Sequence, residues 1–346
     1  MIDTTLTHMP TKQNRAEAAR PLVRKWLILI ALFIFAIVIV GGATRLTDSG
    51  LSITEWQPLL GVIPPLNSSD WEVAFQKYKL SSEFKLQNNT MEMAAFQFIY
   101  WWEWSHRILG RLLGVVFLVP FLAFALTGRL EGRMWPRLLL LFFLGGAQGA
   151  LGWYMVSSGL VDRVDVSQYR LAAHLSLAVV LFAATIWVIT SLDHRHKFSR
   201  TLDAWAAFII LILILLQIAG GGFVAGLDAG MGYNTWPLMD GKWIPNDLLV
   251  MVPAWRNIFE NALTVQFDHR MLAYFILLLA IWHALRTFSI SAMIVAYAVF
   301  AQACLGILTL LLHVRLGVAL CHQAMALIVV LAAVWNLHKK TSATES

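Results

Sequence analysis

The sequence contains few charged residues for its length. Asp, Glu, Lys and Arg make up 13% of the 346 residues, about half the share that is typical of soluble domains. Hydrophobic residues account for 59%, and the mean hydropathy is +0.67. These values exclude a soluble globular protein such as a Rossmann or barrel enzyme, and they predict an integral membrane protein.

Cysteine is also scarce. The two cysteines, Cys304 and Cys321, both lie in apolar runs, and their spacing fits neither a zinc motif nor a disulfide framework. The sequence assigns them no role. The net charge of +6 comes from basic residues spread over short loops. Because no basic stripe is interleaved with aromatic residues, we expect no nucleic-acid partner.

Uncharged runs predict an all-α integral membrane protein with eight transmembrane helices, surrounded by lipid. The runs cover residues 26–44, 112–128, 138–161, 171–192, 204–227, 271–285, 287–312 and 316–337. Basic residues gather before the first run and in alternate loops, whereas most acidic residues lie in the opposite loops. By the positive-inside rule, both termini are predicted to be cytoplasmic.

The two halves of the chain share a pattern of residues. At an offset of 180, Gly41, Gly42, Asp48, Gly50 and Trp56 match Gly221, Gly222, Asp228, Gly230 and Trp236; at 163, His106-Arg107 matches His269-Arg270; at 154, Gln148 and Gly152 match Gln302 and Gly306. The order of these landmarks predicts two pseudo-symmetric four-helix bundles, related by an axis along the membrane normal. We therefore expect a basic tail (1–25), an N-terminal bundle (26–200), a C-terminal bundle (201–338) and a second cytoplasmic tail (339–346).

Four of the ten histidines follow this repeat: His106, His174, His269 and His322 lie near the predicted outer ends of the even-numbered helices, two per half. An ionisable residue inside a membrane span is costly and indicates function. Two imidazoles from facing helices suit a six-coordinate haem, so we predict one haem in each bundle. A hydrogen bond across a helix interface is the alternative for any single histidine. Zinc or copper is less favoured, because no cysteine or carboxylate ligand recurs in both halves.

The repeat contains one difference with chemical content. Glu103 precedes His106 by one helical turn, whereas Gln266 holds the matching place before His269. Because a carboxylate beside a metal-bound substrate can relay protons, the first half is predicted to carry out chemistry and the second to transfer electrons. An exposed interfacial acid is the alternative interpretation of Glu103.

Two further features leave alternatives open. Arg107 and Arg270 are either candidate partners of haem propionates or interfacial side chains that reach toward water. In the long outer loop, the aromatic residues of segment 70–86 recur at helical spacing. We expect an amphipathic helix there, which either packs on the bundle or lies on the lipid surface.

Four segments resemble the haem A synthase family: GGATRLTDSGLS (41–52), FIYWWEWSHRILGR (98–111), GGFVAGLDAGMGYNTWPLM (221–239) and VQFDHRMLAY (265–274). The resemblance extends from about residue 26 to residue 335. It implies oxidation of the C8 methyl group of haem O to a formyl group, which gives haem A for terminal cytochrome oxidases. The alternative function is a di-haem b-type membrane electron-transfer protein. A transporter is less favoured, because the spans contain few polar residues beyond the histidines.

The resemblance also implies roles for single residues. His269 and His322 match the ligands of a haem b cofactor, His106 and His174 match the histidines of the substrate haem site, and Glu103 matches the essential glutamate of the family. Some bacterial members carry a cysteine pair in the first outer loop, but residues 43–96 contain no cysteine. The chain is thus more similar to the proteobacterial and mitochondrial branch, and its short tail favours a bacterial inner membrane. Candidate partners are haem O synthase, cytochrome oxidase assembly factors, a second copy of the chain and an electron-transfer partner that the sequence does not identify.

Overall fold

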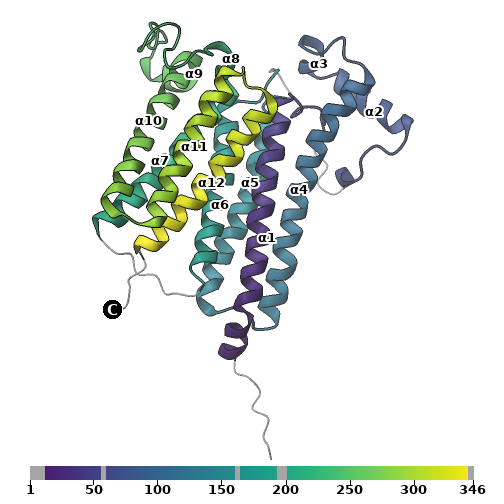
Figure 1. Cartoon of the computed structure of the whole chain (residues 1–346). Helices are drawn as coiled ribbons and strands as arrows, with labels where there is room; N and C mark the ends of the chain where they lie inside the picture. Colours follow the sequence, from purple (N-terminus) through teal and green to yellow (C-terminus); the bar gives the residue numbers. More distant parts are fainter. Residues whose placement is uncertain (1–11, 56–59, 160–163, 193–200, 342–346) are drawn as a thin grey trace, which may run out of the picture.

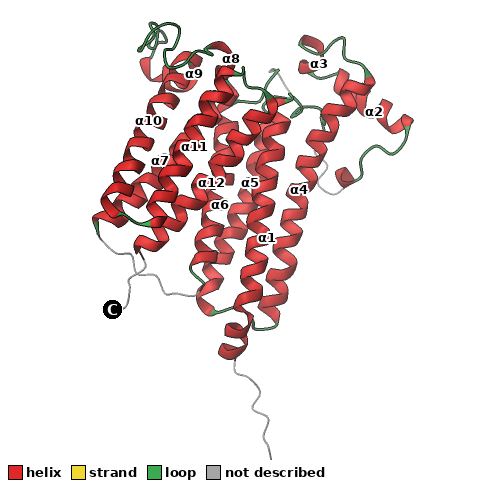
Figure 2. Ribbon diagram, in the orientation of Figure 1, coloured by secondary structure: helices red, strands yellow, loops and turns green. Residues whose placement is uncertain are grey.

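The computed structural model describes residues 12–55, 60–159, 164–192 and 201–341. These residues form helices and connecting loops (Figure 2), and the only pairing of extended backbone among them is a bridge between Met239 and Lys242. Within this described part, eight helices are long and apolar enough to cross a membrane. The predicted all-α fold with eight transmembrane helices is therefore confirmed.

Short helices gather at one end of the eight long helices. The long helices are α1 (Lys12–Leu46), α4 (Met93–Leu126), α5 (Trp135–Val156), α6 (Gln168–Thr190), α7 (Leu202–Gly226), α10 (Ala262–Thr287), α11 (Ile290–Leu311) and α12 (Leu316–Thr341). The short helices are α2 (Ser68–Lys79), α3 (Ser82–Leu86), α8 (Ala229–Gly232) and α9 (Asn257–Glu260), with 3-10 turns η1 (Leu60–Val62), η2 (Gly132–Met134) and η3 (Ala254–Arg256). Helices α2, α3, α8 and α9 lie at one end of the bundle, which we call the outer end. Helix α1 begins and helix α12 ends at the opposite end (Figure 1). Which end faces the cytoplasm stays a prediction.

Besides α1, two transmembrane helices begin well before the predicted spans. Helix α4 begins at Met93 rather than near residue 112, and α10 begins at Ala262 rather than near residue 271. The apolar runs broke at charged residues, but such residues need not end a helix when they are paired within it. In α4, Arg107 and Glu103 form an i,i+4 ion pair at 2.5 Å. The outer turns of both helices, with their histidines, are therefore helical.

The basic segment before the first span is partly helical. Helix α1 already begins at Lys12, so residues 12–25 of the predicted tail continue into the membrane-spanning helix without a break. Residues 1–11 of this tail and residues 342–346 of the C-terminal tail lie outside the described residues. The division into two tails and two bundles stays a prediction.

The core lies where the helices of the two halves meet. Helices α1 and α6 of the N-terminal half contact α7 and α12 of the C-terminal half. Side chains from both halves join one buried cluster, including Leu27 on α1, Ile210 on α7 and Leu327 on α12. Since helices in a bilayer associate mainly through close packing, these four helices hold the halves together. The pseudo-symmetry of the two bundles remains a prediction.

Segment 70–86 forms two helices, α2 and α3, instead of one. Asn67 and Ser81 cap them, each accepting a hydrogen bond from the backbone N–H three residues later. Phe75 and Tyr78 of α2 stack on Phe96 of α4, with ring centroids 4.9 and 5.3 Å apart. Of the two alternatives, the structure therefore supports packing on the protein.

Candidate functional site

The first histidine pair lies in the outer half of the N-terminal bundle. His106 on α4 and His174 on α6 have ring centroids 6.5 Å apart, with ring planes at 73°. Bonds of about 2 Å from each imidazole to a metal between them would place the ring centres roughly 6 Å apart. The separation of the two rings therefore fits the axial ligands of one haem iron.

Glycine residues on neighbouring helices make room for all four rings. A Cβ added at these positions would lie 2.7 Å from His106 Cε1 at Gly41, 2.9 Å from His174 Cε1 at Gly152, 3.3 Å from His269 Cε1 at Gly221 and 2.9 Å from His322 Cε1 at Gly306. Gly41 matches Gly221 in the repeat, and Gly152 matches Gly306. Each imidazole thus lies against a helix backbone where a side chain would crowd it, and the arrangement recurs in both halves.

Glutamine amides contact three of the four histidines. The Nε2 atom of Gln148 lies 3.0 Å from the His174 carbonyl oxygen and 3.2 Å from its Nδ1, and the same atom of Gln217 lies 2.9 Å from the His269 carbonyl oxygen and 3.1 Å from its Nδ1. Gln302 Nε2 lies 3.4 Å from His322 Nε2. Side chains that bond an imidazole fix its orientation for metal binding. The repeat had marked Gln148 and Gln302 as landmarks without a role, and Gln217 was missed.

His106 differs from the other three in its surroundings. The position that matches Gln217 in the first half is Ile37, which offers no side-chain hydrogen bond. Among the described residues, the buried Nδ1 atoms of His106 and His322 have no hydrogen-bond partner, and the His106 ring bonds the backbone of Ile37. A buried polar atom without a partner is costly. The His106 ring is therefore held by backbone contacts at Ile37 and Gly41 rather than by a glutamine side chain.

Glu103 is buried, with 3% of its surface exposed. Its Oε2 accepts hydrogen bonds from the Ser52 hydroxyl and the Ile53 N–H, both at 2.7 Å. Its Oε1 accepts from Arg107 Nε at 3.0 Å and Nη2 at 2.5 Å. The interpretation of Glu103 as an exposed interfacial acid is therefore wrong. Both carboxylate oxygens are held, and they connect α4 to the outer loop.

Gln266 holds the matching place in the second half without a charge. Its Nε2 donates to the Ala229 carbonyl at 2.7 Å, and its Oε1 accepts from Arg270 Nη2 at 3.0 Å. The side chain is as deeply buried as Glu103. Both side chains bond an arginine and an outer loop, but the loop offers donors to Glu103 and a carbonyl acceptor to Gln266, and only Glu103 is titratable.

Arg107 and Arg270 both bond the backbone of an outer loop. Arg107 donates to the carbonyls of Ile53 at 2.8 Å and Glu55 at 3.0 Å, and Arg270 to those of Tyr233 at 2.8 Å and Thr235 at 2.9 Å. The accepting residues are again 180 positions apart. Both guanidinium groups thus attach a helix to the loop above it. These contacts occupy donors that propionate pairing would need, so that pairing stays a proposal.

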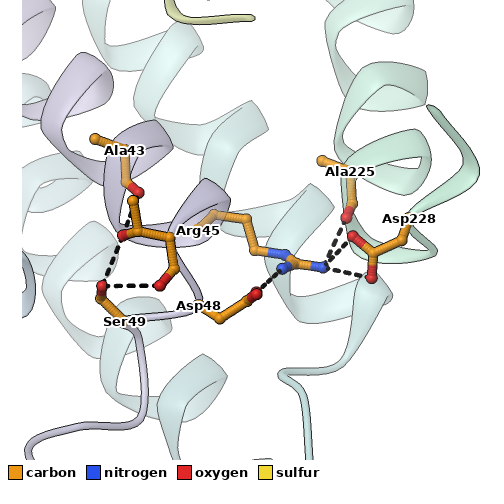
Figure 3. A network of polar contacts seen from close by, with 7 residues as sticks. Ala43, Arg45, Asp48, Ser49, Ala225 and Asp228 are labelled. Carbon is orange, nitrogen blue, oxygen red and sulfur yellow. Dashed lines mark hydrogen bonds and ion pairs between the residues drawn. The ribbon is translucent and has the colours of Figure 1, made fainter. Parts of the chain in front are cut away.

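One arginine connects the two halves at their outer ends (Figure 3). Arg45, near the end of α1, donates to Asp48 at 2.8 Å, to Asp228 at 2.9 Å and to the Ala225 carbonyl at 3.0 Å. The two aspartates match in the repeat, and both adopt left-handed backbone angles, with φ of 48° and 49°. Ala225 stands where a second arginine would be. Sequence reasoning missed Arg45, because the comparison of the halves selected positions that recur.

The described residues offer no alternative metal site. No three His, Cys, Asp or Glu side chains within them gather closely enough to hold a metal ion. Cys304 and Cys321 are unpaired and exposed on the helix surfaces. The paired histidines therefore remain the candidate site, and they suit a haem better than a bare ion.

Fold and site together define a multi-pass membrane protein with two histidine pairs between its helices. The sequence model of the COX15-CtaA family, described as cytochrome oxidase assembly protein, matches residues 24–334. The chain is 51% identical over 333 residues to the heme A synthase of Parvibaculum lavamentivorans, covering 94% of this chain and 96% of that protein. It is 51% identical over 336 residues to that of Mesorhizobium japonicum (94% and 92%) and 50% identical over 322 residues to that of Azorhizobium caulinodans (90% and 92%). The chain belongs to the haem A synthase family.

Proposed function

We propose that the protein is an oxidoreductase that converts the C8 methyl group of haem O to a formyl group, giving haem A for a terminal cytochrome oxidase. The observation that carries this proposal is the buried carboxylate of Glu103, one helical turn from a histidine pair whose rings are spaced for a haem iron. About 50% identity to heme A synthases over more than 90% of the chain supports it.

Each bundle has a distinct part in this proposal. His106 and His174 would hold the substrate haem O, and His269 and His322 would hold haem b as a cofactor. The glycine contacts at all four rings support both assignments. When bound, the haem irons supply the redox chemistry, and the protein supplies binding, orientation and proton handling.

Glu103 is the residue to which we assign proton handling. Oxidation of a methyl group to a formyl group releases protons, and a buried carboxylate can accept them. The Ser52 hydroxyl, 2.7 Å from Oε2, offers a hydrogen-bonded route from the carboxylate toward the outer loop. Arg107 holds Oε1 through two hydrogen bonds and keeps the carboxylate in place. Gln266 cannot take up a proton in this way, which favours electron transfer in the second half.

The cellular setting belongs to the same proposal. The relatives named above are bacterial, and eight transmembrane helices require a membrane. We therefore place the protein in a bacterial inner membrane with both termini in the cytoplasm. Haem O synthase, which would supply the substrate, and assembly factors of the oxidase, which would receive the product, are the expected partners.

The experiment is expression in a host that makes haem O but no haem A, followed by haem extraction and separation with mass detection. Haem A or its hydroxylated precursor is the expected product. Folded, haem-loaded protein that yields only haem b and unmodified haem O would instead support the di-haem electron-transfer alternative.

The matched variant is Glu103→Gln. A glutamine here keeps an oxygen for Arg107, as Gln266 does for Arg270, and loses the hydrogen bond from the Ile53 N–H, so the variant is expected to fold with lower stability and to retain haem. It should form no haem A, because the proton acceptor is gone. Full activity would remove Glu103 from the mechanism.

A further inference from the structure

Helices α4 and α5 pack differently from their counterparts α10 and α11. The latter two contact one another extensively, whereas α4 and α5 meet at few positions. Their ring contacts join Phe117 to Phe142 and Phe121 to Trp135, with centroids 6.2 and 5.6 Å apart, in the half of the helices away from the outer end. These bulky rings hold α4 and α5 apart.

Between these rings and the outer end, the next turns of α4 and α5 carry glycines on the same helix face. Gly114 lies one turn outward from Phe117 on α4, and Gly146 and Gly149 lie one and two turns outward from Phe142 on α5, on the same helix face. A Cβ added at any of the three glycines would have no atom within 4 Å. The space between α4 and α5 therefore remains open above the aromatic contact.

The second half carries side chains at the same positions. At offsets of 163 and 154, Leu277, Phe300 and Ala303 match the three glycines, and Ala280 and Ala296 match Phe117 and Phe142. Small residues at the inner contact let α10 and α11 approach, and Leu277 packs in the outer part, whereas Phe300 is exposed on the helix surface. Ala280 is fully buried, and Leu277 and Ala296 pack on the core cluster. Close helix packing and Leu277 thus close the second half where the bundle with Glu103 has glycines.

The opening leads to the first histidine pair. Gly149 lies one turn from Gly152, which contacts the His174 ring, and Gln148, next to it, bonds His174. The Oε1 atom of Gln148 is buried and has no partner among the described residues. On α4, His106 lies eight residues outward from Gly114, or about 12 Å along the helix. The opening therefore lies next to the histidine pair, on the side of it that faces the middle of the membrane.

We infer that the opening between α4 and α5 binds the isoprenoid side chain of haem O and admits it from the bilayer. This inference rests on the proposed function. Haem O carries a hydroxyethylfarnesyl chain where haem b has a vinyl group, and burial of such an apolar chain contributes about 0.8 kcal/mol per CH₂ group relative to water. A site open to lipid keeps the chain in hydrocarbon while the histidines bind the ring. The closely packed α10–α11 pair suits a haem without this chain.

The test fills the opening and compares two haems. Gly146→Phe and Gly149→Leu place bulky side chains on two successive turns of the opening. Ala147→Leu adds bulk at an exposed position of α5 that lies about 100° or more around the helix from both glycines, and it is the control. Each protein is purified from a host that makes haem O and haem b, and its haems are extracted and quantified. We expect both glycine variants to lose at least tenfold in bound haem O and in haem A formed, with haem b retained, and the control to match the wild type.

Several outcomes would overturn the inference. Haem O content and haem A formation at the wild-type level in both glycine variants would do so, and so would an equal loss of haem O and haem b, because only the side chain distinguishes the two. If the larger variants do not accumulate, Gly146→Ala and Gly149→Ala, which favour helix, must still lower the ratio of bound haem O to haem b. A wild-type protein that binds haem O but makes no haem A would contradict the proposed function alone, and the ratio would still test the opening.

Discussion

The glycine contacts at the histidine rings predict a graded response to alanine. Ordinary contact between such atoms begins near 3.4 Å, and the Cβ of Gly41→Ala would lie 2.7 Å from His106 Cε1, which is 0.7 Å too close. The matched Gly221→Ala would lie 3.3 Å from His269 Cε1, only 0.1 Å too close. Gly41→Ala must therefore displace its histidine, whereas Gly221→Ala requires a shift of a few tenths of an ångström at most.

The size of the effect follows from the cost of overpacking, which is typically about 1–3 kcal/mol. At 1.4 kcal/mol per factor of ten, Gly41→Ala should weaken haem binding at the first pair roughly 5- to 150-fold. Without haem, the ring need not keep the orientation that binds iron, and alanine favours helix over glycine by about 1 kcal/mol. The melting temperature of the haem-free protein should therefore stay constant or rise while haem affinity falls.

The assay is titration of each haem-free variant with haem, followed by absorption, beside thermal unfolding without haem. Gly221→Ala is the control, since it makes the same chemical change at the matched position. Wild-type affinity in Gly41→Ala would refute the reasoning. An equal loss of affinity in both variants would also refute it, because the difference in contact distance would then have no consequence.

Two further predictions concern the outer end. Burial raises the pKa of Glu83 to about 8; because the folded pKa exceeds the ordinary value of 4.5, stability should fall by on the order of a few kcal/mol as pH rises through the window from 4.5 to 8. Glu83→Gln should remove this fall in thermal unfolding measured from pH 4.5 to 9, and an unchanged pH profile would contradict the assignment. Arg45→Gln should lower the unfolding free energy by about 1 kcal/mol, since its aspartate partners are largely exposed. High salt should reduce this difference, and a variant as stable as the wild type at low salt would show that the ion pairs do not hold the halves together.

The sequence predicted those features of the fold that repeat or that depend on apolar runs. The eight helices and the paired positions of His106 and His269 were of this kind. The starts of α4 and α10 were not, because charged residues interrupted the runs, and only the folded structure shows that Glu103 is bonded to the outer loop. Arg45 was missed for the opposite reason: it does not repeat, and its importance comes from Asp228, 183 residues away.

The open space between α4 and α5 could not be read from the sequence either. Gly146 and Gly149 look like ordinary small residues of a membrane helix until the Phe117–Phe142 contact shows that the helices are held apart. A glycine between closely packed helices and a glycine beside an opening give the same sequence signal. What distinguishes them is the distance to the neighbouring helix, which depends on residues elsewhere in the chain.

The halves differ both at Glu103 and at the opening. We therefore predict that transferring the carboxylate alone to the second half will not transfer haem A formation to it. In the double variant Glu103→Gln, Gln266→Glu, the new carboxylate can pair with Arg270 through one oxygen but loses the hydrogen bond to the Ala229 carbonyl, so the protein should fold with lower stability and bind haem. It should form no haem A, because the close packing of α10 and α11 leaves no place for the side chain of haem O beside the second pair. Haem extraction with mass detection checks this. Haem A from the double variant, with none from Glu103→Gln alone, would show that the carboxylate is sufficient and that the opening does not select the substrate.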